Sequence, residues 1–546
     1  MRFLETLTTL LCVTATVAQS YLPELINGQE FPALIDATTE DLVAGLESGL
    51  FTSVDLVEAY IARINQVNVT LNCVTEIDPD AIARAQQADA LRANGTVLSP
   101  LHGIPILIKN NIATGPGDDM NNTAGSYALL GATVPEPSTM VKKLRAAGAI
   151  VLGKTNLSQW ANFRSSNSSN GWSAHGGQTY GAYYPFQDPS GSSSGSGVAS
   201  SIGLALGSLG TETSGSILSP ANVNNVVGIK PTVGLTSRYL VIPISEHQDT
   251  IGPMTRTVKD SAYILQAIAG PDPNDNYTLA SPFVKGPQPD YVGACDYSAF
   301  SGARIGIARN VIEVYSDFLA APVLDAFYKA VSQIEAAGAT IVDANFTAFE
   351  EYVNSDSPGI LYADFVSNLA GYLNELDYNP YDLSTLEQVH NFTQSYPLEE
   401  YPSRDTAVWD TALEAGINNT SSEFWPIYQQ NLYFGGEGGI LGALARTNTT
   451  AVLLPTDISA GIPALVGSPV ITVPLGFYPA NATVQMNRRG NLVDTAPNVP
   501  FGISFLGDLW SEADLIGYAY AYEQRTMHRD DVLPYVVPNL ELADFV

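Results

Sequence analysis

The sequence predicts an α/β protein: one large mixed β-sheet covered by helices on both faces. Short apolar runs typical of buried strands alternate with longer amphipathic segments, which is the pattern of β–α–β units. Hydrophobic residues make up 45% of the 546 residues. Length alone suggests two or more domains, but no proline- or serine-rich linker, charge block or repeat divides the chain. We therefore predict a single large domain.

The early part of the chain, before residue 103, is expected to be helical, and the sheet begins after it. Thr39 and Ser53 each precede an apolar stripe, so each is predicted to cap a helix. The run Gly-Ile-Pro-Ile-Leu-Ile-Lys at 103–109 is apolar without alternation, which indicates a strand buried on both faces. Further elements are a helix over 79–92, a helix near 138–147, a strand at 149–153, and then a long irregular stretch that holds two serine-rich loops.

The strand and helix rhythm resumes in the second half. We expect strands at 304–308, 340–342, 451–454, 470–473 and 502–506, with helices at 321–337 and 511–527. The acidic and aromatic segment 343–446 contains few strand signals. It is predicted to be a helical elaboration near the substrate entrance.

The two ends of the chain carry their own signals. Residues 1–18 have Arg2, an apolar run and a small-residue exit, which is the pattern of a secretory signal peptide; an ordinary buried helix is the alternative. We expect an N-terminal segment at 19–38, the main domain at 39–533 and a C-terminal tail at 534–546. Asn-x-Ser/Thr sites such as Asn94, Asn276 and Asn391 fit a secreted or luminal glycoprotein, whereas Asn156 follows a buried strand and is a poor glycan acceptor.

Composition excludes several partners and cofactors. The formal net charge of −31 repels a phosphate backbone and argues against nucleic acid. No later apolar stretch reaches the roughly 18 residues of a membrane span. Five histidines without metal-ligand spacing, and no Gly-x-Gly-x-x-Gly after a strand, predict neither a metal nor a nucleotide cofactor. After Cys12 leaves with the leader, Cys73 and Cys295 are expected as two buried thiols, with one bridge as the alternative.

Two segments carry candidate catalytic groups. Burial of Lys109 at the end of its strand disfavours the charged form, so a lowered pKa would make it a plausible base for a serine. Ser216 is the candidate nucleophile, because the backbone N–H groups of Thr213, Ser214, Gly215 and Ser216 follow one another around small side chains and could bind an oxyanion. Each segment also has a structural alternative without catalysis. Lys109 could extend to solvent at its strand end, and the residues around Ser216 could form an ordinary Gly/Ser turn.

The other serine-rich loop, Gly191–Gly197, contains Ser192 and Ser193. It could be a flexible linker, and it also matches the Gly-x-Ser-x-Gly elbow of α/β-hydrolases, with Ser193 at its centre. That elbow needs a preceding strand, which residues 183–189 do not resemble, so Ser193 is predicted to support the site by hydrogen bonding. The histidines that would serve the elbow are His247, His390 and His528.

Four motifs together resemble the amidase signature family of serine hydrolases: 103–112, the loop 191–197, the Thr-x-x-x-Gly-Ser-Ile element at 211–217 and Val-Gly-Ile-Lys-Pro-Thr at 227–232. The likeness covers 39–533. It implies the amidase-signature fold and a Lys109–Ser192–Ser216 triad, with a cis peptide bond at Ser192 and hydrogen bonds from Ser192 to both partners. It also implies cofactor-free hydrolysis of a carboxamide C–N bond through a Ser216 acyl-enzyme, giving an acid plus ammonia or amine.

The segments 171–178 and 242–249 most resemble the peptide amidases and their fungal relatives. Ser214, Leu218 and His175 depart from residues common in the family, and 180–184 has no obvious counterpart, which predicts an altered acyl pocket. The partner is expected to be a small-molecule or peptide amide, bound by a monomer or homodimer. Three roles stay open: a scavenging amidase, a tailoring amidase of a fungal secondary-metabolite pathway, and a non-catalytic binding protein on the same fold.

Overall fold

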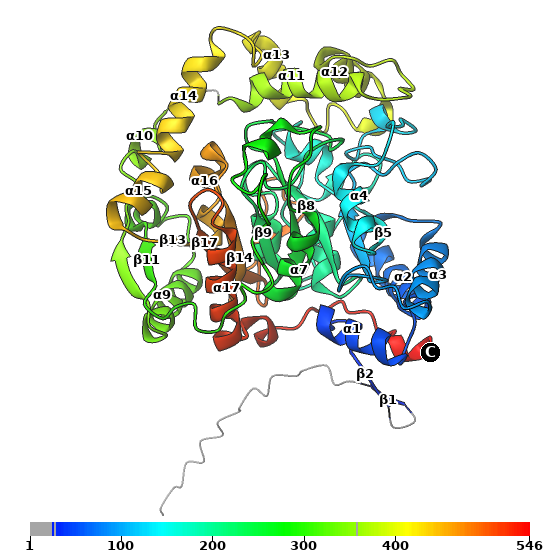
Figure 1. Ribbon diagram of the computed structural model, residues 1–546. Helices are drawn as coiled ribbons and strands as arrows, with labels where there is room; N and C mark the ends of the chain where they lie inside the picture. Colours follow the sequence, from blue (N-terminus) through cyan, green and yellow to red (C-terminus); the bar gives the residue numbers. More distant parts are fainter. Residues whose placement is uncertain (1–23, 27–28, 356–358) are drawn as a thin grey trace, which may run out of the picture.

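A central sheet of eleven strands organises the molecule (Figure 1). The computed structural model describes residues 24–26, 29–355 and 359–546, so the predicted leader 1–18 lies outside the described residues. In sheet order the strands are β12 (Thr340–Asp343), β11 (Arg304–Ile307), β13 (Ala451–Pro455), β17 (Pro500–Leu506), β14 (Val470–Phe477), β9 (Val227–Lys230), β10 (Thr250–Thr255), β8 (Gly207–Glu212), β4 (Pro105–Lys109), β5 (Ile150–Thr155) and β3 (Val74–Ile77).

The sheet is mixed, as predicted. β4 runs parallel to β5 and β8, and β11 runs parallel to β12 and β13, whereas the other pairs are antiparallel. Three small ribbons lie outside it: β1 (Glu24–Ile26) with β2 (Gln29–Phe31), β6 (Trp172–Ser173) with β7 (Gly177–Gln178), and β15 (Gln485–Met486) with β16 (Val493–Thr495). β3, β8, β9 and β10 were not predicted as strands.

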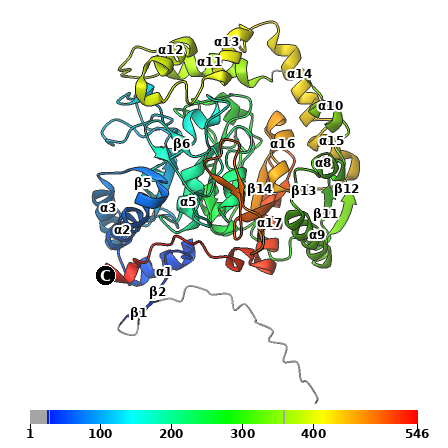
Figure 2. The ribbon, with the colours of Figure 1, turned by 180° about the vertical axis from the view of Figure 1, so that it is seen from behind.

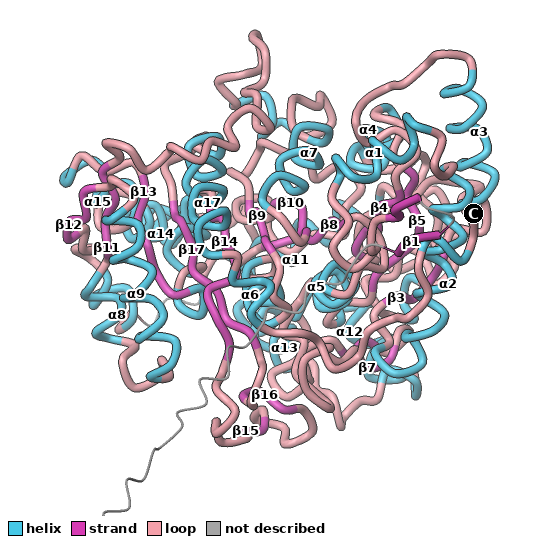
Figure 3. The backbone as a smooth tube through the Cα atoms, turned by 90° about the horizontal axis from the view of Figure 1, so that it is seen from below, coloured by secondary structure: helices cyan, strands magenta, loops and turns pink. Residues whose placement is uncertain are grey.

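Helices cover both faces of the sheet, which confirms the predicted layering. α4 (Thr139–Ala146), α7 (Val258–Ile268) and α17 (Glu512–Thr526) lie on one face, and α5 (Ser194–Ser201) and α6 (Leu218–Val223) lie on the other (Figures 2 and 3). The surrounding helices are α1 (Thr39–Ser48), α2 (Ser53–Leu71), α3 (Ala81–Ala93), α8 (Arg309–Val314), α9 (Ala321–Ala336) and α16 (Gly461–Val466).

The segment predicted as a helical elaboration forms an arch along one end of the sheet (Figure 1). Its residues from Phe365 to Ala412 pack in a core separate from the main one, with the Trp409 ring 6.2 Å from Phe365 and 5.7 Å from Trp160, whereas Phe349 and Phe434 belong to the main core. The helices are α10 (Phe349–Val353), α11 (Leu361–Asn374), α12 (Leu386–Ser395), α13 (Ala407–Ala415), α14 (Phe424–Gly435) and α15 (Ile440–Thr447).

The first two helices begin one residue earlier than the sequence suggests. Thr38 and Thr52, rather than Thr39 and Ser53, are the N-caps, and each accepts a hydrogen bond from the backbone N–H three residues on. In both cases the Asp at that third position bonds back to the cap, which completes a capping box.

The stretch predicted to be irregular contains the buried helix α5 and the strand β8, so that prediction was wrong. α5 consists almost entirely of Ser, Gly and Ala, which gives no apolar stripe and little helix propensity. Tertiary bonds hold it instead: Ser196 Oγ donates to Leu209 O at 3.0 Å and Ser200 Oγ to Met254 O at 2.8 Å.

Two arginines hold the far end of α5. Arg256 donates to Ser200 O at 3.0 Å and Arg529 donates to Ser201 O at 2.8 Å. Arg256 follows β10, whose last residue pairs with the first residue of β8. The arginines therefore bind α5 near the end where β8 begins, opposite to the strand ends at Lys109 and Glu212.

Cys73 and Cys295 are free thiols, as preferred from the sequence, and burial raises the pKa of each to about 12. The tail beyond residue 533 packs onto the N-terminal helices, with an ion pair of 2.7 Å between Arg63 and Glu541. None of the helices in the described ranges is long and apolar enough to span a bilayer.

Candidate active site

Lys109 ends the strand β4, which is buried at every position. Its Nζ lies 2.8 Å from Ser192 Oγ, 2.8 Å from Thr211 Oγ1 and 3.1 Å from Thr211 O. Burial lowers the pKa of Lys109 to about 7, and the carboxylates of Asp249 and Glu212 oppose this only in part. A large share of the lysine is therefore neutral near physiological pH and can accept a proton.

Ser192 follows a cis peptide bond between Gly191 and Ser192. Its side chain is fully buried, and its carbonyl accepts a hydrogen bond from Ser158 N at 3.1 Å. A Cβ atom on Gly191 would lie 2.3 Å from Ser158 Oγ, so only glycine fits there. The loop that looked like a linker in the sequence is a closely packed turn leading into α5.

Ser193 faces the backbone of Thr211. Its Oγ donates to Thr211 O at 3.1 Å and accepts from Thr211 N at 3.2 Å. This is the supporting contact predicted for Ser193, and it ties the serine loop to the end of β8. A helix begins at Ser194, but the residues before Gly191 form no strand, and no hydrogen bond joins Ser193 to a histidine in the described ranges.

Ser216 lies in the turn after β8 and is 8% exposed. Glu212 shapes this turn, because its carboxylate accepts from the N–H groups of Gly215 at 2.8 Å, Ile217 at 2.7 Å and Leu218 at 2.9 Å. The Gly215 N–H is therefore occupied, so the prediction that it helps to bind an oxyanion was wrong. The reason is a local contact: the Glu212 side chain folds back over the start of α6, three to six residues further along the chain.

The neighbouring amides are free. The N–H groups of Thr213, Ser214 and Ser216 donate no hydrogen bond within the part of the chain that the structure describes. Ser193 N donates to Ser216 O at 3.1 Å, which fixes the two loops against each other. No hydrogen bond joins Ser192 Oγ to Ser216 Oγ among the described residues, so the side chains of the predicted triad are joined only between Lys109 and Ser192.

Asp249 is a site residue that sequence reasoning did not single out. It accepts hydrogen bonds from Thr213 Oγ1 at 2.5 Å, Ile244 N at 2.7 Å and Ser245 N at 3.0 Å. Burial raises its pKa despite these donors. A cavity of about 290 Å³ opens beside it and reaches α11, which places the helical arch next to the site as predicted. The motif 242–249 suggested a branch of the family but gave no sign of this contact.

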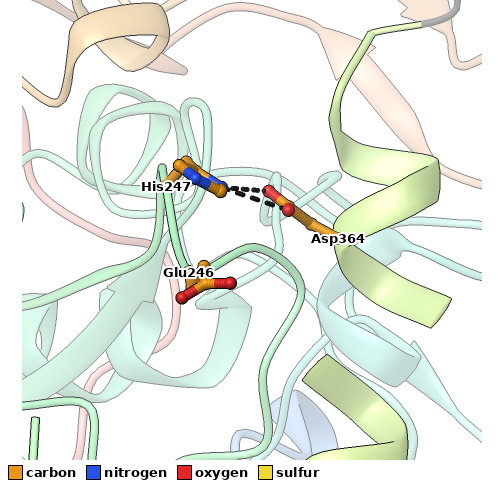
Figure 4. A group of neighbouring side chains, drawn as sticks. All are labelled: Glu246, His247 and Asp364. Carbon is orange, nitrogen blue, oxygen red and sulfur yellow. Dashed lines mark hydrogen bonds and ion pairs between the residues drawn. The ribbon is translucent and has the colours of Figure 1, made fainter. Parts of the chain in front are cut away.

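His247 belongs to a cluster under the arch (Figure 4). Its Nδ1 lies 2.9 Å from Oδ2 of the buried Asp364, and Glu246 lies beside the pair. The three could together face a metal ion, but each carboxylate already has a protein partner: Ser245 Oγ binds Asp364 at 2.5 Å and Asn419 Nδ2 binds Glu246 at 2.6 Å. We interpret the cluster as an anchor for the 242–249 loop.

The positions that depart from the family pattern lie around these loops. Leu218 is buried at the start of α6, while Ser214 is exposed. His175 packs edge-on against Tyr127, with the ring centroids 5.7 Å apart. Tyr183 is buried, with its Oη 3.0 Å from Ser201 Oγ near the end of α5.

Comparison with known proteins identifies the family and the fold of the chain. The family model described as Amidase matches residues 55–423. A protein of Arthroderma benhamiae named as an amidase is 52% identical over 556 residues, covering 97% of this chain and 93% of that protein. The native peptide amidase from Stenotrophomonas maltophilia has a TM-score of 0.80 at 35% identity, covering 92% of this chain and 99% of that one. A peptide amidase PAM structure with the competitive inhibitor chymostatin gives 0.79 at 36% identity, covering 90% and 98%.

This chain therefore belongs to the amidase signature family and is an amidase.

Proposed function

We propose that the protein hydrolyses a carboxamide through an acyl-enzyme on Ser216, with Lys109 and Ser192 as the proton relay. The observation that carries this proposal is the 2.8 Å contact between Lys109 Nζ and Ser192 Oγ, made by a lysine whose pKa burial lowers to about 7. A base with a pKa near the working pH is the most effective one for such a transfer.

The partners of Lys109 favour the required direction. A neutral lysine has two N–H donors and one lone pair. Thr211 O can only accept, and Thr211 Oγ1 lies at 2.8 Å as a second acceptor, so the lone pair is left to face Ser192. Lys109 then takes the Ser192 proton while Ser192 takes the proton of Ser216.

The chemical steps follow from that transfer. Ser216 Oγ attacks the amide carbonyl, and the free N–H groups of Thr213, Ser214 and Ser216 can stabilise the negative oxygen. The relay returns a proton to the leaving nitrogen, the C–N bond breaks, and ammonia or an amine leaves. Water then attacks the Ser216 ester and releases a carboxylic acid, which regenerates the hydroxyl. Ser192 and Ser216 must approach during this cycle, which is common when hydrogen bonds tighten only in the substrate complex.

A fluorophosphonate serine probe followed by peptide mass mapping tests the assignment. We expect an adduct on Ser216, lost in Ser216→Ala and retained in Ser219→Ala, a serine one helical turn further along. Lys109→Ala should slow the labelling strongly without unfolding the protein. An adduct on Ser193, or normal amide hydrolysis by Ser216→Ala, would contradict the mechanism.

We also propose that the protein enters the secretory pathway. Seven of its glycosylation sequons have exposed asparagines: Asn94, Asn167, Asn276, Asn345, Asn391, Asn448 and Asn481. Asn156 is buried, in agreement with its poor rating from the sequence. The protein from its native host should lose mass on treatment with an N-glycosidase and lack residues 1–18. An unglycosylated protein with an intact leader would exclude secretion.

A further inference from the structure

An aromatic cavity of about 420 Å³ lies outside the triad, between α8, α10 and the segment 454–462. Its walls include Tyr315, Phe318, Phe346, Phe349 and Tyr352. The rings follow one another in contact: Tyr315 lies 6.5 Å from Phe318 and 5.8 Å from Phe349, and Phe349 lies 6.1 Å from Tyr352. Phe318 is 69% exposed, so this row of rings leads from the surface inward.

A single carboxylate, Asp457, lines this cavity. Asp457 is exposed to the cavity, yet the surrounding protein removes enough water to raise its pKa. Asn222 Nδ2 donates to its Oδ1 at 3.0 Å, but no Lys, Arg or His of the described chain forms an ion pair with it. Asp457 therefore offers the cavity a carboxylate that no cationic side chain of the described residues compensates.

Two contacts join the cavity to the nucleophile loop. Asn222 lies on α6, the helix that begins two residues after Ser216. Ala460, which lines the cavity, lies 3.5 Å from the position that a Cβ atom on Gly215 would occupy. A substrate acylating Ser216 could therefore extend into the cavity with the rest of its acyl group.

We propose that this cavity is a subsite for an organic ammonium group carried by the acyl part of the amide substrate. The proposal rests on the hydrolytic function proposed above. Aromatic faces attract a cation and accept the alkyl carbons next to it, while Asp457 supplies the opposite charge. A purely apolar group would leave the carboxylate desolvated and unpaired. A divalent metal would find only one carboxylate among rings, which is too few oxygen ligands.

The test uses primary amides, because each releases ammonia and only the acyl part varies. A series of ω-amino carboxamides with four to eight carbons is compared with methyl-terminated amides of matched length and with ω-carboxy amides. We expect the best ω-amino amide to exceed its neutral match by about tenfold in kcat/KM, and the ω-carboxy amide to be the poorest. Equal kcat/KM for all three classes at every length would overturn the proposal.

Variants locate the effect. Asp457→Asn should reduce the ratio of cationic to neutral substrate to near one, and Phe349→Leu, which keeps an apolar wall, should reduce it partly. The matched control is Asp494→Asn, because the Asp494 charge acts on Asp457 although Asp494 does not line the cavity. A melting temperature for each variant separates lost recognition from lost folding. An unchanged ratio in a folded Asp457→Asn variant would assign the preference elsewhere.

Binding separates this proposal from the mechanism. Calorimetry with the Ser216→Ala variant and the best ω-amino amide should give an affinity that falls about tenfold when Asp457→Asn is added. If this dependence is found but the wild-type enzyme hydrolyses none of the amides, the hydrolytic proposal fails and the subsite stands. If neutral amides are hydrolysed well and binding does not depend on Asp457, the subsite fails and the mechanism stands.

Discussion

Two fully buried lysines lie on neighbouring parallel strands, and only one of them faces a group that can give up a proton. Lys109 ends β4 and Lys154 lies in β5, where it pairs with Ile108. Burial lowers the pKa of each to about 7. Lys154 Nζ donates to Ile112 O and, at 2.7 Å, to Asn122 Oδ1, two atoms that can only accept. Lys109 Nζ instead lies 2.8 Å from the Ser192 hydroxyl, which carries a transferable proton.

The difference teaches that a lowered pKa does not by itself make a base. A buried lysine becomes one when a neighbour carries a transferable proton and other acceptors orient its N–H groups. Lys154 cross-links the backbone after β4, and Lys109 is placed to exchange protons. The predictions below alter one lysine or its partners at a time.

Replacement of each lysine by methionine should give the largest contrast. Lys109→Met is expected to lower kcat for a primary amide by about a thousandfold or more, within the range of general base catalysis. Lys154→Met should keep kcat within a few fold, although it lowers the melting temperature. Ammonia release and thermal melting measure the two effects. A similar loss of kcat in both variants would mean that the contrast is structural rather than chemical.

The pH profile should report Lys109. Because its pKa is about 7, kcat/KM is expected to fall about tenfold per pH unit below that value and to level off above it. Lys154→Met should keep this profile. A flat profile below pH 6 would count against a lysine base.

The lowered pKa of Lys109 should also make the free energy of unfolding depend on pH. Between the folded pKa of about 7 and the unfolded value of 10.5, the unfolded chain binds more protons at Lys109, so the free energy of unfolding rises with pH by up to about 1.4 kcal/mol per unit. Lys109→Met should lack this contribution. Urea unfolding at pH 7 and pH 9 measures the difference, and an identical pH dependence in both proteins would refute it.

Thr211→Val should have an intermediate effect. It removes the hydroxyl 2.8 Å from Lys109 Nζ and leaves the shape of the side chain. We expect kcat to fall about tenfold with little change in KM, as orientation of the lone pair is lost. The acid limb of the profile should move to lower pH, because protonated Lys109 loses an acceptor. An unchanged limb would indicate a packing role only.

Asn122→Ala should give the smallest effect on activity. It leaves Lys154 short of one acceptor, which we expect to cost about 1–3 kcal/mol of unfolding free energy in urea while kcat stays near the wild-type value. Asn94→Ala at an exposed position is the control for stability. A large drop in kcat would mean that the Lys154 contacts also position Lys109.

Much of the scaffold could be predicted from residues that act locally. The apolar run before Lys109 predicted a buried strand, and strands such as β11 and β13 lie where their short apolar runs indicated. Thr39 and Ser53, each placed before an apolar stripe, indicated the helix starts to within one residue. Such signals suffice because neighbouring residues in the chain determine them.

The rest depends on contacts between distant segments. α5 has no periodic stripe and is helical only because β8 and β10 satisfy its serines. The Gly215 amide is a local exception: Glu212 lies only three residues earlier, but the sequence does not show that its carboxylate turns back to accept from Gly215 N. Asp457 and the aromatic wall around it come from segments more than a hundred residues apart, so no motif could have revealed them.

Arg256 and Arg529 bind the last carbonyls of α5, and these contacts are a target for engineering faster variants. α5 has eight residues and thus a length of about 12 Å, and it begins two positions after Ser192. Its C-terminal end is fixed by these two arginines, at the end of the helix away from Ser192. Mutant libraries restricted to residues around Ser216 would leave the position of α5 unchanged. Substitutions near residues 256 and 529 would change it.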